Sequence, residues 1–212
     1  AYLEGGKPDT AEADLTQSLT IEPNQPFVLG MRGEARLLQG KITEAIQDQK
    51  KAVQMDPQNP ALHSDLGFSY LFNKDYAEAL SEFKLAAQLA PEQMKVLDPW
   101  VYLAMLQTNQ KSAADAKFQS VIAKKPDARD SVDNLLLFLM GNISNTELLD
   151  SIDQKDVERA KAQICEAYFF IGQKTLLAGD NATAAQNFQA SLNTNMKGLS
   201  AYRGSQYAMQ KF

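Results

Sequence analysis

The segment PALHSDLGFSYLFNKDYAEALSEFKLAAQLAP, residues 60–91, decides the fold of this chain. Its apolar residues recur at the spacing of amphipathic helices. A polar Asn-Lys-Asp stretch divides it into two helices of about a dozen residues. Gly67 and Ala79 are small, which lets the two helices cross closely, whereas Phe83 is large enough to fill the space around the crossing. The segment therefore predicts a helical hairpin.

The same hairpin recurs along the chain. Pro23, Pro57 and Pro91 follow one another at intervals of 34 residues. Two stacked helices with two short turns need about 34 residues, which is the length of a tetratricopeptide repeat. Residues 26–57 repeat the pattern of small positions, with the polar Gln49 where the best copy has a phenylalanine. The chain thus resembles the tetratricopeptide repeat (TPR) family.

The resemblance implies an all-α fold, a right-handed α-solenoid of helix-turn-helix repeats closed by a C-terminal capping helix. We predict one solenoid domain over residues 1–212, beginning within a repeat, with a turn at Glu4–Lys7 before its first helix. The predicted parts are a partial repeat at 1–23, repeats at 26–57, 60–91 and 94–126, an irregular helix pair at 130–156, a repeat at 160–195 and a capping helix at 199–211.

Two stretches depart from the template. The interval between Pro91 and Trp100 is three residues too long for a regular third repeat. In the irregular pair, Ser131–Met140 is predicted to form a helix that stops at Gly141. Asn145 is then expected to cap the next helix, which is too short for a full repeat.

Composition narrows the functional class. The chain is 44% hydrophobic and 22% charged, as expected for a soluble helical protein with a continuous core. A formal charge of −5 at pH 7 argues against a nucleic-acid partner, since phosphates require a basic surface. No apolar run reaches the roughly 18 residues that a transmembrane helix requires. A single cysteine, Cys165, excludes an internal disulfide.

The residues that carry catalysis or bind metals are sparse. His63 is the one histidine of the chain, and we interpret both His63 and Cys165 as packing residues. We predict that the protein is not an enzyme and has no metal site and no cofactor, and we keep a cryptic enzyme or metal protein as an alternative. Six aspartates at i, i+3 spacing fit helix caps and solvated faces better than a calcium loop, namely Asp127, Asp130, Asp133, Asp150, Asp153 and Asp156.

The concave side of such a solenoid is lined by the first helix of each repeat. An apolar strip there, rimmed by Glu34, Asp98 and Glu166, would suit an extended or helical peptide with basic side chains. Packing between neighbouring helices is the alternative for any one of these residues, and self-association of the chain is the alternative function. The predicted partner-binding groove comprises Phe27, Glu34, Leu37, Ser64, Phe68, Leu71, Val101, Met105, Phe169 and Gln173.

Residues 98–208 carry a narrower resemblance. Five short motifs occur in the order found in bacterial envelope TPR lipoproteins of the NlpI type: Trp100–Ala104, Met140–Ser144, Cys165–Gln173, Gly179–Asp180 and Tyr202–Arg203. That resemblance implies a bacterial scaffold in the periplasm or cell envelope that binds protein or peptide partners and forms homodimers. A cytoplasmic location stays open as the alternative.

Overall fold

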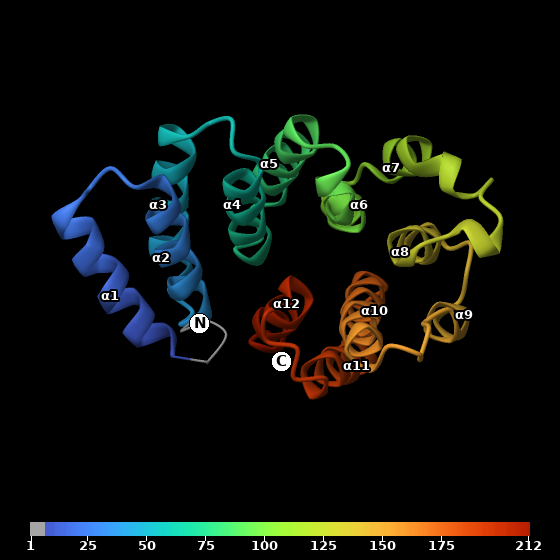
Figure 1. Cartoon of the computed structure of the whole chain (residues 1–212). Coiled ribbons are helices and arrows are strands. Elements are labelled where there is room, and N and C mark those ends of the chain that lie inside the picture. Colours follow the sequence, from blue (N-terminus) through green and yellow to red (C-terminus); the bar gives the residue numbers. More distant parts are fainter. Residues whose placement is uncertain (1–6) are drawn as a thin grey trace. The chain divides into compact units, whose positions relative to one another are not determined.

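The computed structural model describes residues 7–212, and every regular element in this range is a helix (Figure 1). The predicted all-α class is confirmed. Residues 1–6 lie outside the described range, and with them all of the predicted Glu4–Lys7 turn except Lys7. The chain divides into two compact units, Ala1–Asn109 and Gln110–Phe212. The boundary falls between the two helices of the predicted repeat at 94–126, and a single domain stays a prediction.

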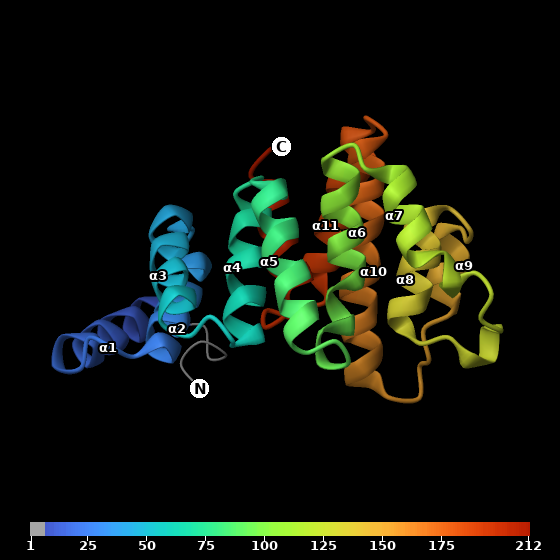
Figure 2. The ribbon, with the colours of Figure 1, turned by 90° about the horizontal axis from the view of Figure 1, so that it is seen from above.

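Unit 1 is a succession of antiparallel helices in which each helix packs against the next. The side-by-side pairing of α4 and α5 is visible in Figures 1 and 2. Its helices are α1 (Pro8–Ile21), α2 (Pro26–Leu38), α3 (Ile42–Met55), α4 (Pro60–Phe72), α5 (Tyr76–Leu89), the 3₁₀ helix η1 (Gln93–Leu97) and α6 (Asp98–Gln107).

Proline positions explain where several of these helices begin. Pro26 and Pro60 occupy the first positions of α2 and α4. A backbone N–H has no helical partner at that position, so proline costs nothing there and its fixed φ favours the helix. Asn59 adds a cap by accepting a hydrogen bond from the N–H of Ala61 at 3.1 Å. The extra length before Trp100 is taken up by η1.

The turn inside each repeat has one recurring backbone geometry. Gly40 (φ 78°), Lys74 (φ 69°) and Asn109 (φ 58°) are left-handed and lie at intervals of 34 and 35 residues. Gly179 (φ 86°) takes the same conformation in unit 2. At Lys74 the N–H donates to the carbonyl of Leu71, and the next N–H donates to the carbonyl of Tyr70, which satisfies the last acceptors of α4.

An ionic network ties the first three helices together. Asp48 on α3 accepts two hydrogen bonds from Arg32 and one from Arg36, each of 2.7 Å. Arg36 also donates to Glu12 of α1 at 2.9 Å, and Lys41 reaches the same carboxylate at 2.7 Å. Because the Asp48 side chain is 8% exposed, its ion pairs with Arg32 and Arg36 are screened little by solvent.

Unit 2 contains the irregular region and the last full hairpin. Its helix α10 packs against α8, α9, α11 and α12, so this long helix organises the unit. Figures 1 and 2 both show α10 beside α11. The helices are α7 (Lys111–Phe118), η2 (Gln119–Val121), η3 (Pro126–Ala128), α8 (Ser131–Met140), α9 (Asn145–Asp150), α10 (Val157–Leu177), α11 (Asn181–Asn193) and α12 (Ser200–Met209).

The irregular pair has well-formed ends. Gly141 ends α8 with a left-handed φ of 90°, as predicted. Ser144 caps α9, one residue before the predicted Asn145. Its hydroxyl accepts from the N–H of Glu147, and the Glu147 carboxylate accepts from the N–H of Ser144 at 2.7 Å. This reciprocal capping box is a stronger start signal than a single asparagine.

Candidate partner-binding sites

Four of the predicted groove residues in unit 1 keep accessible surface. Phe27, in the first turn of α2, is 71% exposed, which is unusual for a large aromatic side chain. Glu34 and Ser64, on α2 and α4, are partly exposed. These positions can contact a partner without a change of the fold.

Phe68 is also only partly buried, but its ring packs within unit 1. It contacts Phe72, Phe83 and Trp100, the last two in edge-to-face geometry with centroids 5.0 Å apart. Four further predicted groove residues are buried, as the packing alternative expects: Leu37, Leu71, Val101 and Met105.

The two predicted groove residues of unit 2 differ. Phe169 is fully buried, with its ring centroid 5.1 Å from that of Phe170 and 6.1 Å from that of Phe188. Gln173 lies one turn further along α10 and is partly exposed. Partner binding at all ten positions stays a prediction.

His63 occupies a structural position in unit 1. Its Nδ1 lies 2.6 Å from a carboxylate oxygen of Glu82, and its Nε2 lies 3.0 Å from the carbonyl oxygen of Pro57. The ring therefore links α4 to α5 and to the turn before α4. Since both nitrogens are engaged and the residue is buried, the ring has no free face for a substrate.

Cys165 and the aspartates also have structural roles. The Cys165 thiol is buried, and burial raises its pKa, which suppresses the reactive thiolate. Asp130 and Asp156 cap α8 and α10, as interpreted from the sequence. Asp133 completes the cap of α8 and pairs with Lys124 at 2.8 Å. Among residues 7–212, no three acidic, histidine or cysteine side chains are grouped as metal ligands would be.

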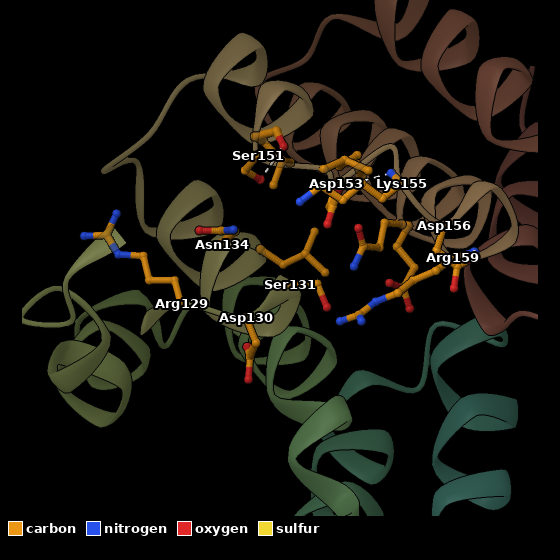
Figure 3. Close-up of a pocket in the computed structure, with 15 residues that line it drawn as sticks. Arg129, Asp130, Ser131, Asn134, Ser151, Asp153, Lys155, Asp156 and Arg159 are labelled. Carbon is orange, nitrogen blue, oxygen red and sulfur yellow. Dashed lines mark hydrogen bonds between the residues drawn. The ribbon is translucent and has the colours of Figure 1, made fainter. Parts of the chain in front are cut away.

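A pocket of about 310 Å³ opens in unit 2 at the irregular helix pair (Figure 3). It is bounded by the first half of α8, the end of α9, the loop that follows α9, and the first half of α10. Figure 3 shows polar side chains from all these segments around it, among them Asn134, Ser151, Lys155 and Arg159. A volume of this size falls at the lower end of the range for ligand sites.

The pocket lining combines four buried apolar side chains with a larger number of polar ones. Leu135, Leu148, Ile152 and Ala167 are buried side chains that line it. Five partly buried polar residues accompany them, namely Arg129, Ser131, Asn134, Gln163 and Glu166. Glu166 is the acidic member of this set, and it is carried by α10 between Cys165 and Ala167.

The electrostatics of the pocket centre on Glu166. Burial raises the pKa of its carboxyl to about 7 from an ordinary value of 4.5. Desolvation is the cause, because no hydrogen bond or ion pair to another residue of the described range offsets it. The environment of Glu166 therefore disfavours the ionised carboxylate relative to the protonated form.

The rim of the pocket is charged and exposed. Lys155 and Arg159 lie at the surface, and within residues 7–212 their side chains form no hydrogen bond or ion pair. Asp153 and Asp156 also line the rim, and their carboxylates accept hydrogen bonds from the backbone N–H groups of Lys155 and Arg159. The rim thus presents two cations with free donors.

Glu166 was expected at the rim of the partner-binding groove, because its position and acidity are visible in the sequence. The pocket was not predicted, since its shape arises where α8 and α9 depart from the repeat. The charged stretch that contains Asp153, Lys155 and Arg159 was the sequence feature that could have indicated a pocket here.

Comparison with known proteins agrees with the helical-hairpin class. Residues 33–74 match the family model described as TPR repeat, and this segment covers the end of α2, all of α3 and all of α4. The prediction of a TPR repeat is confirmed for this part of the chain. None of the curated proteins compared with the chain matches it.

Solved structures extend the likeness of fold to most of the chain. MamA is 16% identical with a TM-score of 0.52, and the match covers 92% of each chain. A tetratricopeptide repeat protein from Parabacteroides merdae is 18% identical with a TM-score of 0.56, covering 98% of this chain and 94% of that one. The Cut9–Hcn1 hetero-tetramer of the APC/C is 16% identical with a TM-score of 0.59, covering 91% of this chain and 38% of that one. The predicted TPR solenoid class is confirmed.

Within residues 7–212, every helix is too short or too polar to cross a membrane.

Proposed function

We propose that this protein is a non-catalytic scaffold that binds a protein or peptide partner on the first helices of its repeats. The match of residues 33–74 to the TPR repeat carries this proposal, since helical hairpins of this type offer extended surfaces for peptides. The exposed Phe27 ring supports it, because aromatic residues are enriched at the centre of protein interfaces.

Photo-crosslinking in the native cells tests the proposal. A benzophenone amino acid in place of Phe27 should form adducts with a defined partner protein. The same group in place of Leu85 is the matched control, because Leu85 is an exposed apolar residue on α5, the second helix of its repeat. Identical adducts from both positions, or none from Phe27, would reject the proposal.

The cellular setting is a second part of the proposal. The resemblance of residues 98–208 to NlpI-type envelope lipoproteins supports a role in the bacterial periplasm or cell envelope, where such a scaffold would bring enzymes to their targets. Cell fractionation followed by detection of the protein checks this. Recovery in the cytoplasmic fraction alone would reject the envelope role.

Self-association is the alternative use of the same surface. Ile21 and Phe27 flank the turn between α1 and α2, and each is more than two thirds exposed. A second copy of the chain could cover them. Measurement of the mass in solution over a range of concentrations decides between a monomer and a persistent homodimer.

A further inference from the structure

In the pocket of unit 2, the carboxylate of Glu166 lacks a hydrogen-bond donor or ion-pair partner among the described residues. Of the carboxylates that line the pocket, Asp153 and Asp156 accept hydrogen bonds from backbone N–H groups, and Asp130 accepts one from the N–H of Asp133. Glu166 has no such donor within the described residues. A carboxylate removed from water without compensation is costly, and a bound cation or hydrogen-bond donor removes that cost.

The walls next to Glu166 determine which kind of cation fits. Leu135, Leu148 and Ala167 present buried apolar surface to the pocket. A bare metal ion would gain nothing from such walls, since hard cations require several oxygen ligands. A basic side chain satisfies both parts, because its methylene stem packs on apolar surface while its charged head seeks a carboxylate.

The rim adds a second requirement. Lys155 and Arg159 have free donors and stand at the mouth of the pocket. Asp153 and Asp156 stand at the same rim, but their carboxylates already accept backbone hydrogen bonds, so the free donors of Lys155 and Arg159 can pair with an acidic group of the partner outside the pocket. A guanidinium pairs with a carboxylate in a well-defined bidentate geometry, which would fix the register of the bound segment.

We propose that this pocket binds one basic side chain of a partner peptide, with its charged head at Glu166 and an adjacent acidic residue at Arg159 and Lys155. This rests on the proposed peptide-binding function and names the chemistry of one anchoring contact. The anchor lies at the irregular pair α8–α9, so the departure from the repeat creates a site that regular hairpins lack.

A titration of the whole chain with short blocked peptides tests the assignment. The probe is an alanine-rich peptide with a central Lys-Glu pair, and the readout is the shift of backbone amide signals in nuclear magnetic resonance. The signals of Asn134, Ser151 and Gln163 should move on titration. A peptide with norleucine in place of lysine keeps the stem and loses the charge, and it should bind about tenfold more weakly, as expected for loss of a charge-assisted hydrogen bond.

Matched variants complete the test. Glu166→Gln should weaken binding of the Lys-Glu peptide about tenfold. Glu158→Gln should leave it unchanged, because Glu158 is an exposed residue of the same helix that lies outside the pocket and pairs with Lys161. If Glu166→Gln failed to fold, the difference between the lysine and norleucine peptides on the unmodified chain would still decide.

Equal binding of the lysine and norleucine peptides would overturn the pocket assignment. So would amide signal changes that are confined to residues outside unit 2. The outcome is distinguishable from failure of the broader function. A partner that crosslinks at Phe27 and binds Glu166→Gln as tightly as the unmodified chain refutes the anchor and retains the scaffold. Lysine-dependent binding in the pocket with no adduct at Phe27 supports the anchor and refutes the binding surface at Phe27.

Discussion

Gly67 of α4 lies directly against the ring of Phe83 of α5. A Cβ atom on Gly67 would stand 2.6 Å from both Cδ1 and Cε1 of that ring, closer than real Cβ atoms approach a carbon. The same relationship recurs in unit 2, where a Cβ atom on Gly172 would stand 2.7 Å from the ring of Phe188, and in both pairs the phenylalanine follows the glycine by sixteen positions. The missing side chain of the first helix is the space into which the ring of the second helix packs.

Gly67→Ala should therefore destabilise the protein by about 1–3 kcal/mol, since the buried Phe83 ring is also held by Phe68 and cannot move away freely. Urea unfolding followed by circular dichroism measures the change. Gly198→Ala is the control, because a Cβ atom there would have no neighbour within 4 Å in the described residues. An unchanged midpoint for Gly67→Ala would mean that the two helices can separate at no cost.

The sequence was sufficient to predict these hairpins because spacing alone determines them. Gly67, Ala79 and Phe83 sit at fixed offsets within a 34-residue period, and each offset places a residue on the face where the two helices meet. In the copy at 26–57, Gln49 takes the place of Phe83, and a Cβ atom on Gly33 would stand 2.7 Å from Cγ of Gln49. The Gln49 carbonyl accepts a hydrogen bond from Ser69, whereas its amide nitrogen has no partner in the described residues. The small residue, Gly33, is thus present in this copy although its partner, Gln49, is polar.

The conformation of Lys74 was not predicted, because lysine gives no signal for a left-handed turn. The equivalent residues Gly40 and Gly179 are glycines, which adopt positive φ without a penalty from a Cβ atom. Lys74 adopts it because the carbonyls of α4 require the donors that this turn supplies. The hydrogen bonds at the end of α4 thus impose a geometry that a lysine disfavours.

Lys74→Gly should consequently stabilise the protein by about 1 kcal/mol, since the left-handed conformation costs a residue with a Cβ atom about 1–2 kcal/mol. Lys51→Gly is the matched control, because Lys51 is exposed within α3 and the same change should cost about 1 kcal/mol there. The two thermal midpoints should move in opposite directions. Destabilisation by both substitutions would show that the turn at Lys74 is relaxed.

The predicted groove was harder to derive than the fold. Of the residues that the offsets select on the first helices, Phe27 and Glu34 keep accessible surface, whereas Leu37 and Leu71 are buried. The period of a sequence predicts the helix face on which a residue lies. It does not predict how far a neighbouring helix buries that residue. The pocket at Glu166 could not be predicted from the 34-residue period, since it depends on the short helices α8 and α9, which do not follow that period.

Acidification between pH 4.5 and 2 should remove stability contributed by Glu12. Hydrogen bonds from Lys41 and then Arg36 lower the pKa of Glu12 from 4.5 to about 2. A lowered folded-state pKa gives stability that is present above pH 4.5 and lost as the pH falls through 2. Because these partners are partly solvated, we expect about 1 kcal/mol.

Glu12→Gln measures this contribution directly. The variant should be about 1 kcal/mol less stable at pH 7 and equal to the unmodified protein near pH 2. Glu22→Gln, an exposed glutamate just beyond α1, should change stability by less than about 0.5 kcal/mol at both pH values. A loss for Glu12→Gln that stayed constant with pH would instead indicate a packing effect.

Glu166 should give the opposite pH dependence in a separate window. Desolvation raises its pKa from 4.5 to about 7, so the folded state binds the proton more tightly than the unfolded chain. Stability from this residue is complete below pH 4.5 and falls as the pH rises through 7. The other charged residues that face it across the pocket are Arg129, Asp130, Asp153, Lys155, Asp156 and Arg159.

Glu166→Gln should therefore match the unmodified protein near pH 4 and exceed its stability at pH 8, by at most about 3 kcal/mol. Thermal unfolding at both pH values measures the difference, and Glu158→Gln should show no such trend. Equal stability at pH 8 would mean that the Glu166 carboxylate is already compensated in the free protein. In that case a basic side chain of a partner would gain little at this pocket, because the cost that its binding removes would not exist.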